Sequence, residues 1–346
     1  MVALFMQLKH DVAKRLIVHI GLGKTGTTTL QTHLFPDLTR SRGFLYNPKE
    51  FMVISSKKYR YSEQDKIEFL TLCNSSDILI SAENIVDWNP RNWVSAADRA
   101  LDLFDKDAII VITVRDSQEY MRSRYCQLIQ EGNIISPEEF FVDSTAYDEL
   151  TPFLAPLSIL RFDHQKFDLY FLKKLYQERF NDVYILPLTR LDSLYPWKQL
   201  FNMSNTEIID FKNKLKTSPH ENRSFSAIAL RLTILREKFL NIFGVRSIGS
   251  SDIILRRAIT KGENKDISFR KLPLFLKFRE FPKRILNIMA KSVVLNWRWW
   301  MQRVLDRLVP YKKYRLPLDN VNFDSSLMEA NKKLIEESES HIDTIN

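Results

Sequence analysis

Short apolar runs alternate with longer amphipathic stretches along the first two hundred residues. The runs are rich in Ile, Val and Leu with little polar alternation, which is typical of strands covered on both faces. They predict strands at Leu16–Ile20, Gly43–Tyr46, Asp77–Ala82, Ala108–Val114 and Val183–Leu188. Helices are predicted between them at Thr27–Leu34, Glu63–Cys73, Asn92–Phe104, Gln118–Glu131 and Gln165–Phe180. This alternation predicts an α/β fold with a central parallel sheet flanked by helices.

The pattern changes after about Leu188, where longer helical stretches replace the alternation. Two of these are Ser226–Ile242 and Ser325–Ser340, and a basic, aromatic stretch interrupted by prolines lies between them. We therefore expect an α/β core over residues 1–245 and a basic aromatic helical insertion or subdomain over 246–320. Residues 321–346 are expected to form a C-terminal helix that packs on the core.

Charge is distributed unevenly along the 346 residues. The net charge is +9, yet Arg256 to Arg315 holds 17 Lys or Arg against 4 Asp or Glu, an excess of +13 that leaves −4 for the rest. Three interpretations of this stretch stay open: a solvated helical subdomain, one wall of a cleft for an anionic saccharide, or a surface that contacts an anionic membrane. Nucleic acid is the least favoured partner, because no recognised nucleic-acid motif accompanies the basic residues.

The cysteine content and the lack of long apolar runs bear on the compartment. Only Cys73 and Cys126 occur, without the CxxC spacing typical of zinc sites, and we expect both to be buried thiols in a reducing compartment. The first residues make a poor signal peptide, and no run of about 18 apolar residues predicts a membrane span. We expect a cytoplasmic protein, with peripheral contact at the inner membrane face through residues 256–315 as an open alternative.

The segment from Ile17 to Leu30 has the pattern of a strand, a glycine-bearing loop and the start of a helix. Glycines let the backbone turn tightly, and successive N–H groups at a helix start form a concavity that suits a phosphate. A Walker A loop would need glycine at position 18, where Val18 lies within the strand, so this loop is too short to wrap a triphosphate in that way. The residues expected to bind the anion are Lys24, Thr25, Gly26, Thr27, Thr28 and Thr29.

The run KTGTT at Lys24–Thr28 resembles the 5′-phosphosulfate loop of the PAPS-dependent sulfotransferase superfamily, which uses 3′-phosphoadenosine-5′-phosphosulfate (PAPS). It is close to the loop of bacterial carbohydrate sulfotransferases and of heparan N-deacetylase/N-sulfotransferases. The resemblance implies a P-loop NTPase-like three-layer sandwich, PAPS as donor, 3′,5′-adenosine bisphosphate (PAP) as product, and no metal. The acceptor it implies is a hydroxyl or amine of a saccharide or glycoconjugate.

The superfamily carries a second cofactor element, in which an Arg ends a later strand and a Ser follows eight residues on. Arg115 and Ser123 have this spacing, which implies that they hold the 3′-phosphate. An Arg fork and a Ser hydroxyl are suitable donors to a phosphate dianion, and Arg122 offers further charge. The sequence departs from the pattern at Ser117, where relatives commonly have Pro. We expect Ser117 to begin the helix as an N-cap instead.

Two residues are candidates for catalysis. Lys24 is placed by its loop to stabilise the leaving phosphate oxygen. Glu83 follows a predicted strand and matches the position of a catalytic Glu in glycosaminoglycan sulfotransferases, so we expect a partly buried general base. The alternative for Glu83 is a structural ion pair at the strand end, for example with Lys24.

Histidine is the base in other branches of the superfamily. His19 lies in the first predicted strand and is expected to be packed and hydrogen-bonded, whereas His164 lies among loops and is a candidate for the acceptor site. Some relatives have a His one turn after the 3′-phosphate Ser, but this chain has Gln127 there. Two other functions stay open: a P-loop kinase of a small molecule or sugar, and a non-catalytic nucleotide-fold protein that binds an anionic membrane surface.

Overall fold

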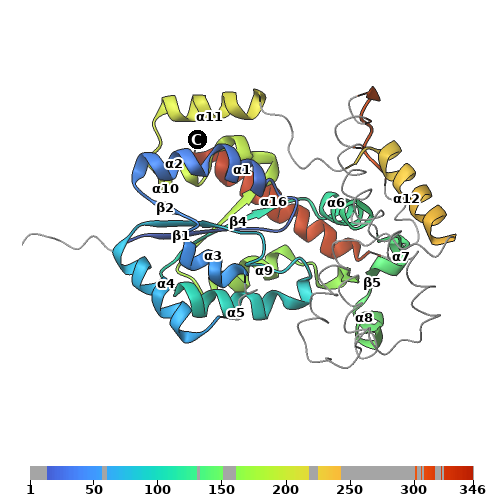
Figure 1. Cartoon of the computed structure of the whole chain (residues 1–346), viewed down its shortest axis with the longest axis horizontal. Helices are drawn as coiled ribbons and strands as arrows, with labels where there is room; N and C mark the ends of the chain where they lie inside the picture. The colour runs from blue at the N-terminus through green and yellow to red at the C-terminus, as the bar shows by residue number, and fades with distance from the viewer. Residues whose placement is uncertain are drawn as a thin grey trace, which may run out of the picture. The chain divides into compact units, whose positions relative to one another are not determined.

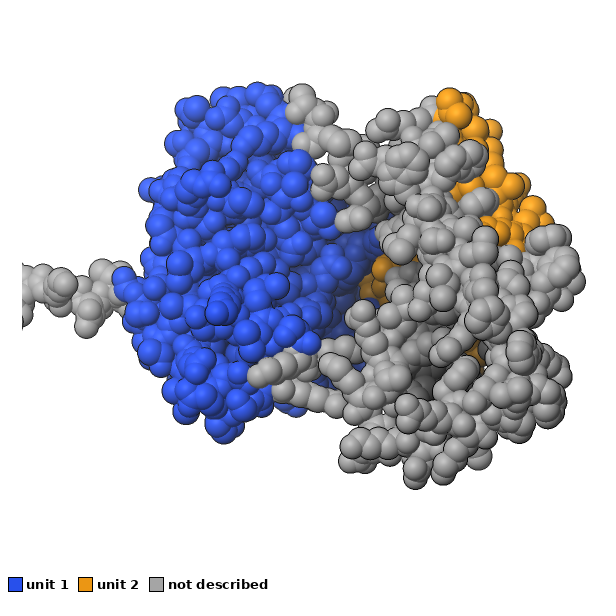
Figure 2. Space-filling view, viewed as in Figure 1, with its two compact units in different colours: residues 1–117, 166–221, 325–346 blue, residues 118–165, 222–324 orange. Residues whose placement is uncertain are grey.

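The chain forms two compact units, which are distinguished in Figure 2. The computed structural model describes residues 14–56, 61–130, 133–150, 161–217, 225–242, 308–315 and 323–345, and the single residues 301, 305 and 321. Unit 1 comprises Met1–Ser117, Lys166–Glu221 and Ser325–Asn346, and unit 2 comprises Gln118–Gln165 and Asn222–Asp324. The predicted insertion over 246–320 lies outside the described residues except for 301, 305 and 308–315.

Unit 1 is built on a parallel sheet of five strands in the order β2-β3-β1-β4-β7. The central strand β1 is buried along its whole length, because β-branched and Leu side chains cover both of its faces. Pairing with its two neighbours begins one residue apart along β1, since Leu16 pairs with Ile78 of β3 and Ile17 with Ile109 of β4. The strands are β1 (Leu16–Gly21), β2 (Leu45–Tyr46), β3 (Ile78–Ser81), β4 (Ile109–Val114) and β7 (Asp182–Pro187).

Helices cover both faces of this sheet, so unit 1 is compatible with a three-layer α/β sandwich (Figure 1). One face carries α1 (Thr27–His33), α2 (Phe35–Arg42), α10 (Trp197–Leu200) and α11 (Asn205–Thr217), and α16 (Ser325–Ile345) packs along the edge strand β7 and against α9. The other carries α3 (Lys49–Ser56), α4 (Glu63–Ser75), α5 (Trp93–Phe104) and α9 (Leu169–Gln177). Because all strands run the same way, their carboxyl ends meet at one edge of the sheet, where ligands of open α/β sheets bind.

Unit 2 is smaller in its described part and is organised around aromatic side chains. Phe140, Phe141 and Phe162 lie in mutual ring contact, with Phe141 and Phe162 at the start of two short parallel strands. Phe323 packs edge-on against both Phe141 and His164. The elements of unit 2 are α6 (Ser117–Gln130), which begins on the last residue of unit 1, α7 (Pro137–Phe140), β5 (Phe141–Val142), α8 (Ser144–Leu150), β6 (Phe162–Asp163) and α12 (Ala227–Ile242).

The five predicted strands are confirmed, each within two residues of its expected bounds. The predicted helix Gln165–Phe180 is shorter in the structure, because Asp168 accepts a hydrogen bond from the N–H of Phe171 and so caps the helix that begins at Leu169. The predicted C-terminal helix is confirmed and extends to Ile345. It packs against α9 and β7.

A fully buried side chain, Asn331, joins α16 to the start of α9. Its Oδ1 accepts a hydrogen bond from the backbone N–H of Leu169, and its Nδ2 donates to the carbonyl of Phe167, both at 2.7 Å. Since the first N–H groups of a helix have no intrahelical partner, Asn331 supplies one to α9 from 162 residues away. The C-terminal helix is therefore fixed to the sheet layer by a specific polar contact as well as by apolar packing.

We expect Asn331→Ala to lower the free energy of unfolding by about 2 kcal/mol, because two buried backbone groups lose their partner. Guanidinium denaturation of the purified chain measures this. The matched control is Glu337→Ala on the same helix, which removes an exposed contact with the Tyr170 hydroxyl and is expected to cost less than about 1 kcal/mol. Equal losses for the two variants would contradict the role assigned to Asn331.

Candidate functional site

The loop between β1 and α1 adopts a conformation that L-residues rarely take. Lys24 has a φ of 71° and Gly26 a φ of 83°, so two residues of the loop are left-handed, with Thr25 between them. Alternation of this kind turns successive backbone N–H groups toward one side and makes a concavity for anions. A non-glycine residue held at positive φ is also typical of functional sites. The loop predicted between β1 and α1 is therefore a tight turn with two left-handed residues.

The backbone angle of Gly26 favours glycine, and a side chain here would also displace two leucines. A Cβ at this position would lie 2.8 Å from Leu188 Cδ1 and 3.2 Å from Leu191 Cδ2. Both leucines belong to the 3-10 segment η4 (Leu188–Ser193), which follows β7. One side of the loop therefore packs against η4, which follows the edge strand β7 and begins 162 residues after Gly26.

Two hydroxyls of the loop are buried without a partner. Thr25 Oγ1 and Thr27 Oγ1 have no hydrogen-bond partner in the described part of the chain, and both residues are at most 1% exposed. They lie over Gly21, where a Cβ would come within 2.2 Å of Thr27 Oγ1 and 3.0 Å of Thr25 Oγ1. Buried polar atoms are almost always hydrogen-bonded, so a bound ligand or water at this loop would supply a partner that the protein itself does not. Thr28 and Thr29, on the first turn of α1, are half-buried.

Arg115 connects this loop to the end of β4. Its Nη1 donates to the carbonyl of Lys24 at 3.2 Å, and its side chain is half-buried. The contact arises because β1 and β4 are parallel neighbours, with Gly21 paired to Thr113. The structure therefore brings together Lys24 and Arg115, two predicted site residues that are 91 positions apart.

Ser123 lies on α6 in unit 2 and is buried, with 2% of its surface exposed. Arg122 does not serve as the additional free cation that we expected, because its guanidinium is 2.6 Å from the Glu119 carboxylate. The ammonium of Lys313 also donates a hydrogen bond to the Glu119 carboxylate, at 3.1 Å. Burial opposes ionisation of Glu119, but the hydrogen bonds from Arg122 and Lys313 outweigh it and lower its pKa to about 2. The charge of Arg122 is thus already balanced within unit 2.

Glu83 follows β3 at the carboxyl edge of the sheet, next to the strand that leads into the loop. The N–H of Ala82 donates to the carbonyl of His19, so the two chains still run side by side there. The Glu83 side chain itself is exposed, which corrects the expectation of a partly buried carboxylate. The reason is that Glu83 lies two residues beyond the end of β3, in a turn that the helices do not cover. Among the described residues, the alternative ion pair between Glu83 and Lys24 is not formed either.

His19 is structural, as its position in the first strand predicts. It is fully buried, with Nδ1 2.8 Å from Ser81 Oγ on β3 and Nε2 2.5 Å from Thr113 Oγ1 on β4. Burial lowers its pKa to about 3, so the ring is neutral and joins the three central strands. The sequence analysis did not predict that Gln31 on α1 would take part in this network. Its Nε2 donates to the Ser81 carbonyl at 2.9 Å and to Ser81 Oγ at 3.1 Å.

His164 is 5% exposed and packs edge-on against Phe323, with burial lowering its pKa. A residue so enclosed in its own unit has little surface left for an acceptor, so the described packing gives no support to the acceptor role. Gln127 occupies the position where some members of the superfamily have a histidine. It is half-buried on α6, and its Oε1 accepts a hydrogen bond from Arg124 at 3.0 Å.

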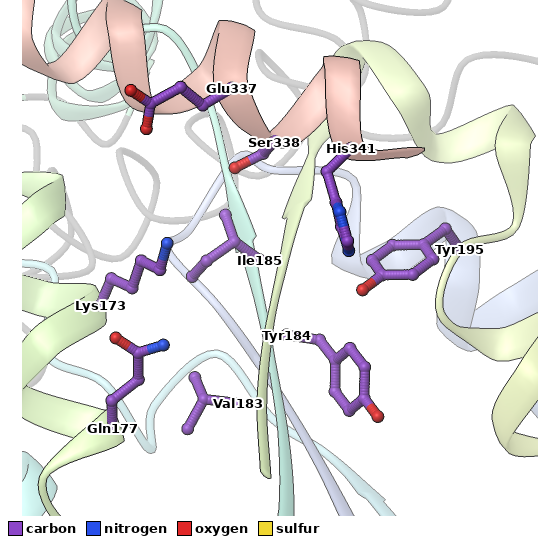
Figure 3. A pocket seen from close by; sticks show the side chains of 9 residues that line it. All are labelled: Lys173, Gln177, Val183, Tyr184, Ile185, Tyr195, Glu337, Ser338 and His341. Atoms are coloured by element: carbon purple, nitrogen blue, oxygen red, sulfur yellow. The ribbon is translucent and has the colours of Figure 1, made fainter. Parts of the chain in front are cut away.

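A cavity of about 200 Å³ lies at the free edge of β7, between α9 and α16 (Figure 3). Its floor is the first half of the strand, Val183–Ile185, whereas the anion loop follows the carboxyl ends of the strands. None of the predicted site residues lines it. The ring of Tyr195 stands edge-on to both Tyr184 and His341 on its far side. We conclude that this cavity is separate from the candidate site. Its lining residues are Lys173, Gln177, Val183, Tyr184, Ile185, Tyr195, Glu337, Ser338 and His341.

Within the described residues, no helix has the length and apolar character that crossing a bilayer requires. No family model matches the chain, and neither a curated protein nor a solved structure matches it. Its function is accordingly inferred from its own residues and their geometry.

Proposed function

We propose that the chain is a PAPS-dependent sulfotransferase with a P-loop NTPase-like core, acting on a hydroxyl or amine of a saccharide or glycoconjugate. The observation that carries this is the pair of buried, unpartnered hydroxyls of Thr25 and Thr27 in a left-handed loop. That pair supports an anion site at the end of β1. The KTGTT pattern and the eight-residue spacing of Arg115 and Ser123 support a doubly phosphorylated donor over a triphosphate.

In this proposal each predicted residue has a distinct task. The backbone N–H groups and hydroxyls from Thr25 to Thr29 bind the 5′-phosphosulfate, with the start of α1 adding its favourable dipole end. Arg115 binds the 3′-phosphate with its guanidinium while its contact with the Lys24 carbonyl fixes the loop. Ser123 is assigned to the same phosphate by its spacing from Arg115.

Transfer needs in-line geometry, removal of one proton and stabilisation of one leaving oxygen. The bond between sulfur and the bridging phosphate oxygen breaks as a bond from sulfur to the acceptor oxygen or nitrogen forms. Lys24 places its ammonium at the leaving oxygen, whose negative charge develops on PAP. Glu83 accepts the acceptor's proton, and because its carboxylate is exposed in the described chain, the acceptor itself must supply the burial that makes it an effective base.

The compartment and the partners follow the same proposal. A cytoplasmic location agrees with two free cysteines, of which Cys126 is buried and Cys73 half-buried. The basic stretch from Arg256 to Arg315 supplies cations either for an anionic acceptor or for a peripheral membrane contact. No metal is assigned a step.

The nucleotide preference tests the proposal by thermal denaturation. At a concentration 100-fold above its Kd, PAP is expected to raise the melting temperature by about 5 °C, and ATP with Mg²⁺ by clearly less. Adenosine 5′-monophosphate is the matched control, since it lacks the 3′-phosphate that Arg115 and Ser123 are assigned to bind. A shift with ATP and Mg²⁺ that equals or exceeds the PAP shift would favour the P-loop kinase instead.

A further inference from the structure

Ser117 carries a third buried hydroxyl that has no hydrogen-bond partner in the described chain. The residue is 2% exposed, and its Oγ is fully enclosed. We expected it to act as an N-cap, which would give the hydroxyl a backbone N–H partner. The structure instead starts α6 on Ser117 itself, inside the helix rather than before it, and the hydroxyl is left over.

Its place in the fold relates it to the anion loop. Gly21 on β1 pairs with Thr113 on β4, and Thr25 and Ser117 each follow their strand partner by four residues. Two residues before Ser117, the side chain of Arg115 contacts the loop at Lys24. Unit 1 therefore carries unpartnered, buried hydroxyls after both central strands: those of Thr25 and Thr27 after β1, and that of Ser117 after β4.

We propose that the Ser117 hydroxyl is a binding residue for the 3′-phosphate assigned to Arg115, just as the hydroxyls of Thr25 and Thr27 are assigned to the 5′-phosphosulfate. This inference rests on the proposed function for the identity of the ligand, a nucleotide with phosphates at both ends. It goes beyond the Arg-and-Ser spacing, which assigns nothing to position 117. Serine at a position where proline would be structurally sufficient then has a chemical reason: proline fixes the helix start but donates no hydrogen bond.

The role has an energetic signature that a structural hydroxyl lacks. A buried hydroxyl without a partner destabilises the ligand-free protein, and a ligand that accepts its hydrogen bond recovers that loss. Removing the hydroxyl should then stabilise the free chain and weaken ligand binding at once. A hydroxyl that served only the fold would change stability in the opposite direction and leave binding unchanged.

The test compares Ser117→Ala and Ser117→Pro with the unmodified full chain. PAP affinity is measured by titration calorimetry, and the denaturation midpoint is measured without ligand. Both variants are expected to bind PAP about tenfold more weakly, the equivalent of one hydrogen bond, with a midpoint equal to or above that of the unmodified chain. The control is Thr39→Ala, which removes a buried hydroxyl that donates to the Phe35 carbonyl at 2.7 Å, and it should lower the midpoint without changing affinity.

Unchanged PAP affinity in both Ser117 variants would overturn the inference, as would a lowered midpoint with unchanged affinity. If the unmodified chain does not bind PAP, the proposed function fails separately. Inorganic phosphate is then the probe for the site beside Arg115, and equal phosphate affinity in the unmodified and Ser117→Ala chains would exclude Ser117 from that site. Absence of phosphate binding in the unmodified chain would overturn both proposals.

Discussion

Lys24→Ala is expected to lower the turnover of PAPS about 100- to 1,000-fold, the loss typical of removing one group that stabilises developing charge. In the proposed reaction the ammonium of Lys24 acts on the leaving oxygen only as the bond to sulfur breaks, so the effect should fall on kcat more than on KM. The measurement is transfer of the labelled sulfuryl group from PAPS, either to water as free sulfate or to a mixture of oligosaccharides as sulfate ester.

Two variants separate this catalytic role from the structural one. Lys24→Gly removes the same ammonium and also relieves a φ of 71°, so its denaturation midpoint should not fall below that of Lys24→Ala, while turnover is lost equally. Arg115→Ala removes a binding residue, so it should raise KM and weaken PAP affinity more than it lowers kcat. Normal turnover in both Lys24 variants would show that the loop is not the site of transfer.

The stability of the chain is expected to fall on mild acidification because of His19. The folded pKa of about 3 lies below the ordinary value of 6.5, so the unfolded chain binds the proton first. The contribution of neutral His19 to the free energy of unfolding is therefore complete above pH 6.5 and is lost as the pH falls toward 3. Between pH 6.5 and 5, before most carboxylates titrate, the loss should approach about 1.4 kcal/mol per pH unit.

Denaturation of the unmodified chain and of His19→Asn at pH 7, 6 and 5 tests this. The variant should be less stable at pH 7, since it breaks the bridge between Ser81 and Thr113, but the difference should shrink steadily toward pH 5. Burial lowers the pKa of His164 in the same direction, and that contribution is common to both proteins. Stability curves that stay parallel across the window would mean that His19 is accessible to protons in the folded state.

The sequence predicted the sheet well for a physical reason. Strands β1, β3 and β4 are buried on both faces, and such strands leave uninterrupted apolar runs of Ile, Val and Leu. The two-residue strands β5 and β6 of unit 2 were not predicted, because they are held by packing among Phe140, Phe141 and Phe162 and leave no periodic pattern. The helix after residue 165 was predicted too long because apolar periodicity continues through the cap at Asp168.

The candidate site was predicted in part. The loop from Lys24 to Thr29 was predicted from its local pattern, and Arg115 and Ser123 were assigned from the resemblance to the sulfotransferase superfamily. The structure places Arg115 in contact with the Lys24 carbonyl. Burial of Glu83 was predicted wrongly, since position in the sequence does not show how far beyond the covered sheet a side chain projects. Ser117 was noticed only as a departure from a pattern, and its sequence context suggested a cap.

The sequence by itself determined strand β1 and the glycine- and threonine-bearing loop after it, because backbone requirements and apolar periodicity depend on neighbouring residues. The tertiary structure alone decided which hydroxyls have a partner. The hydroxyls of Ser81 and Thr113 are hydrogen-bonded to His19 across the sheet. The hydroxyls of Thr25, Thr27 and Ser117 are buried without a hydrogen-bond partner in the described chain. Hydrogen-bond partners of buried groups come from segments far apart in the chain, so the hydroxyls without a partner become visible only once the strands stand side by side.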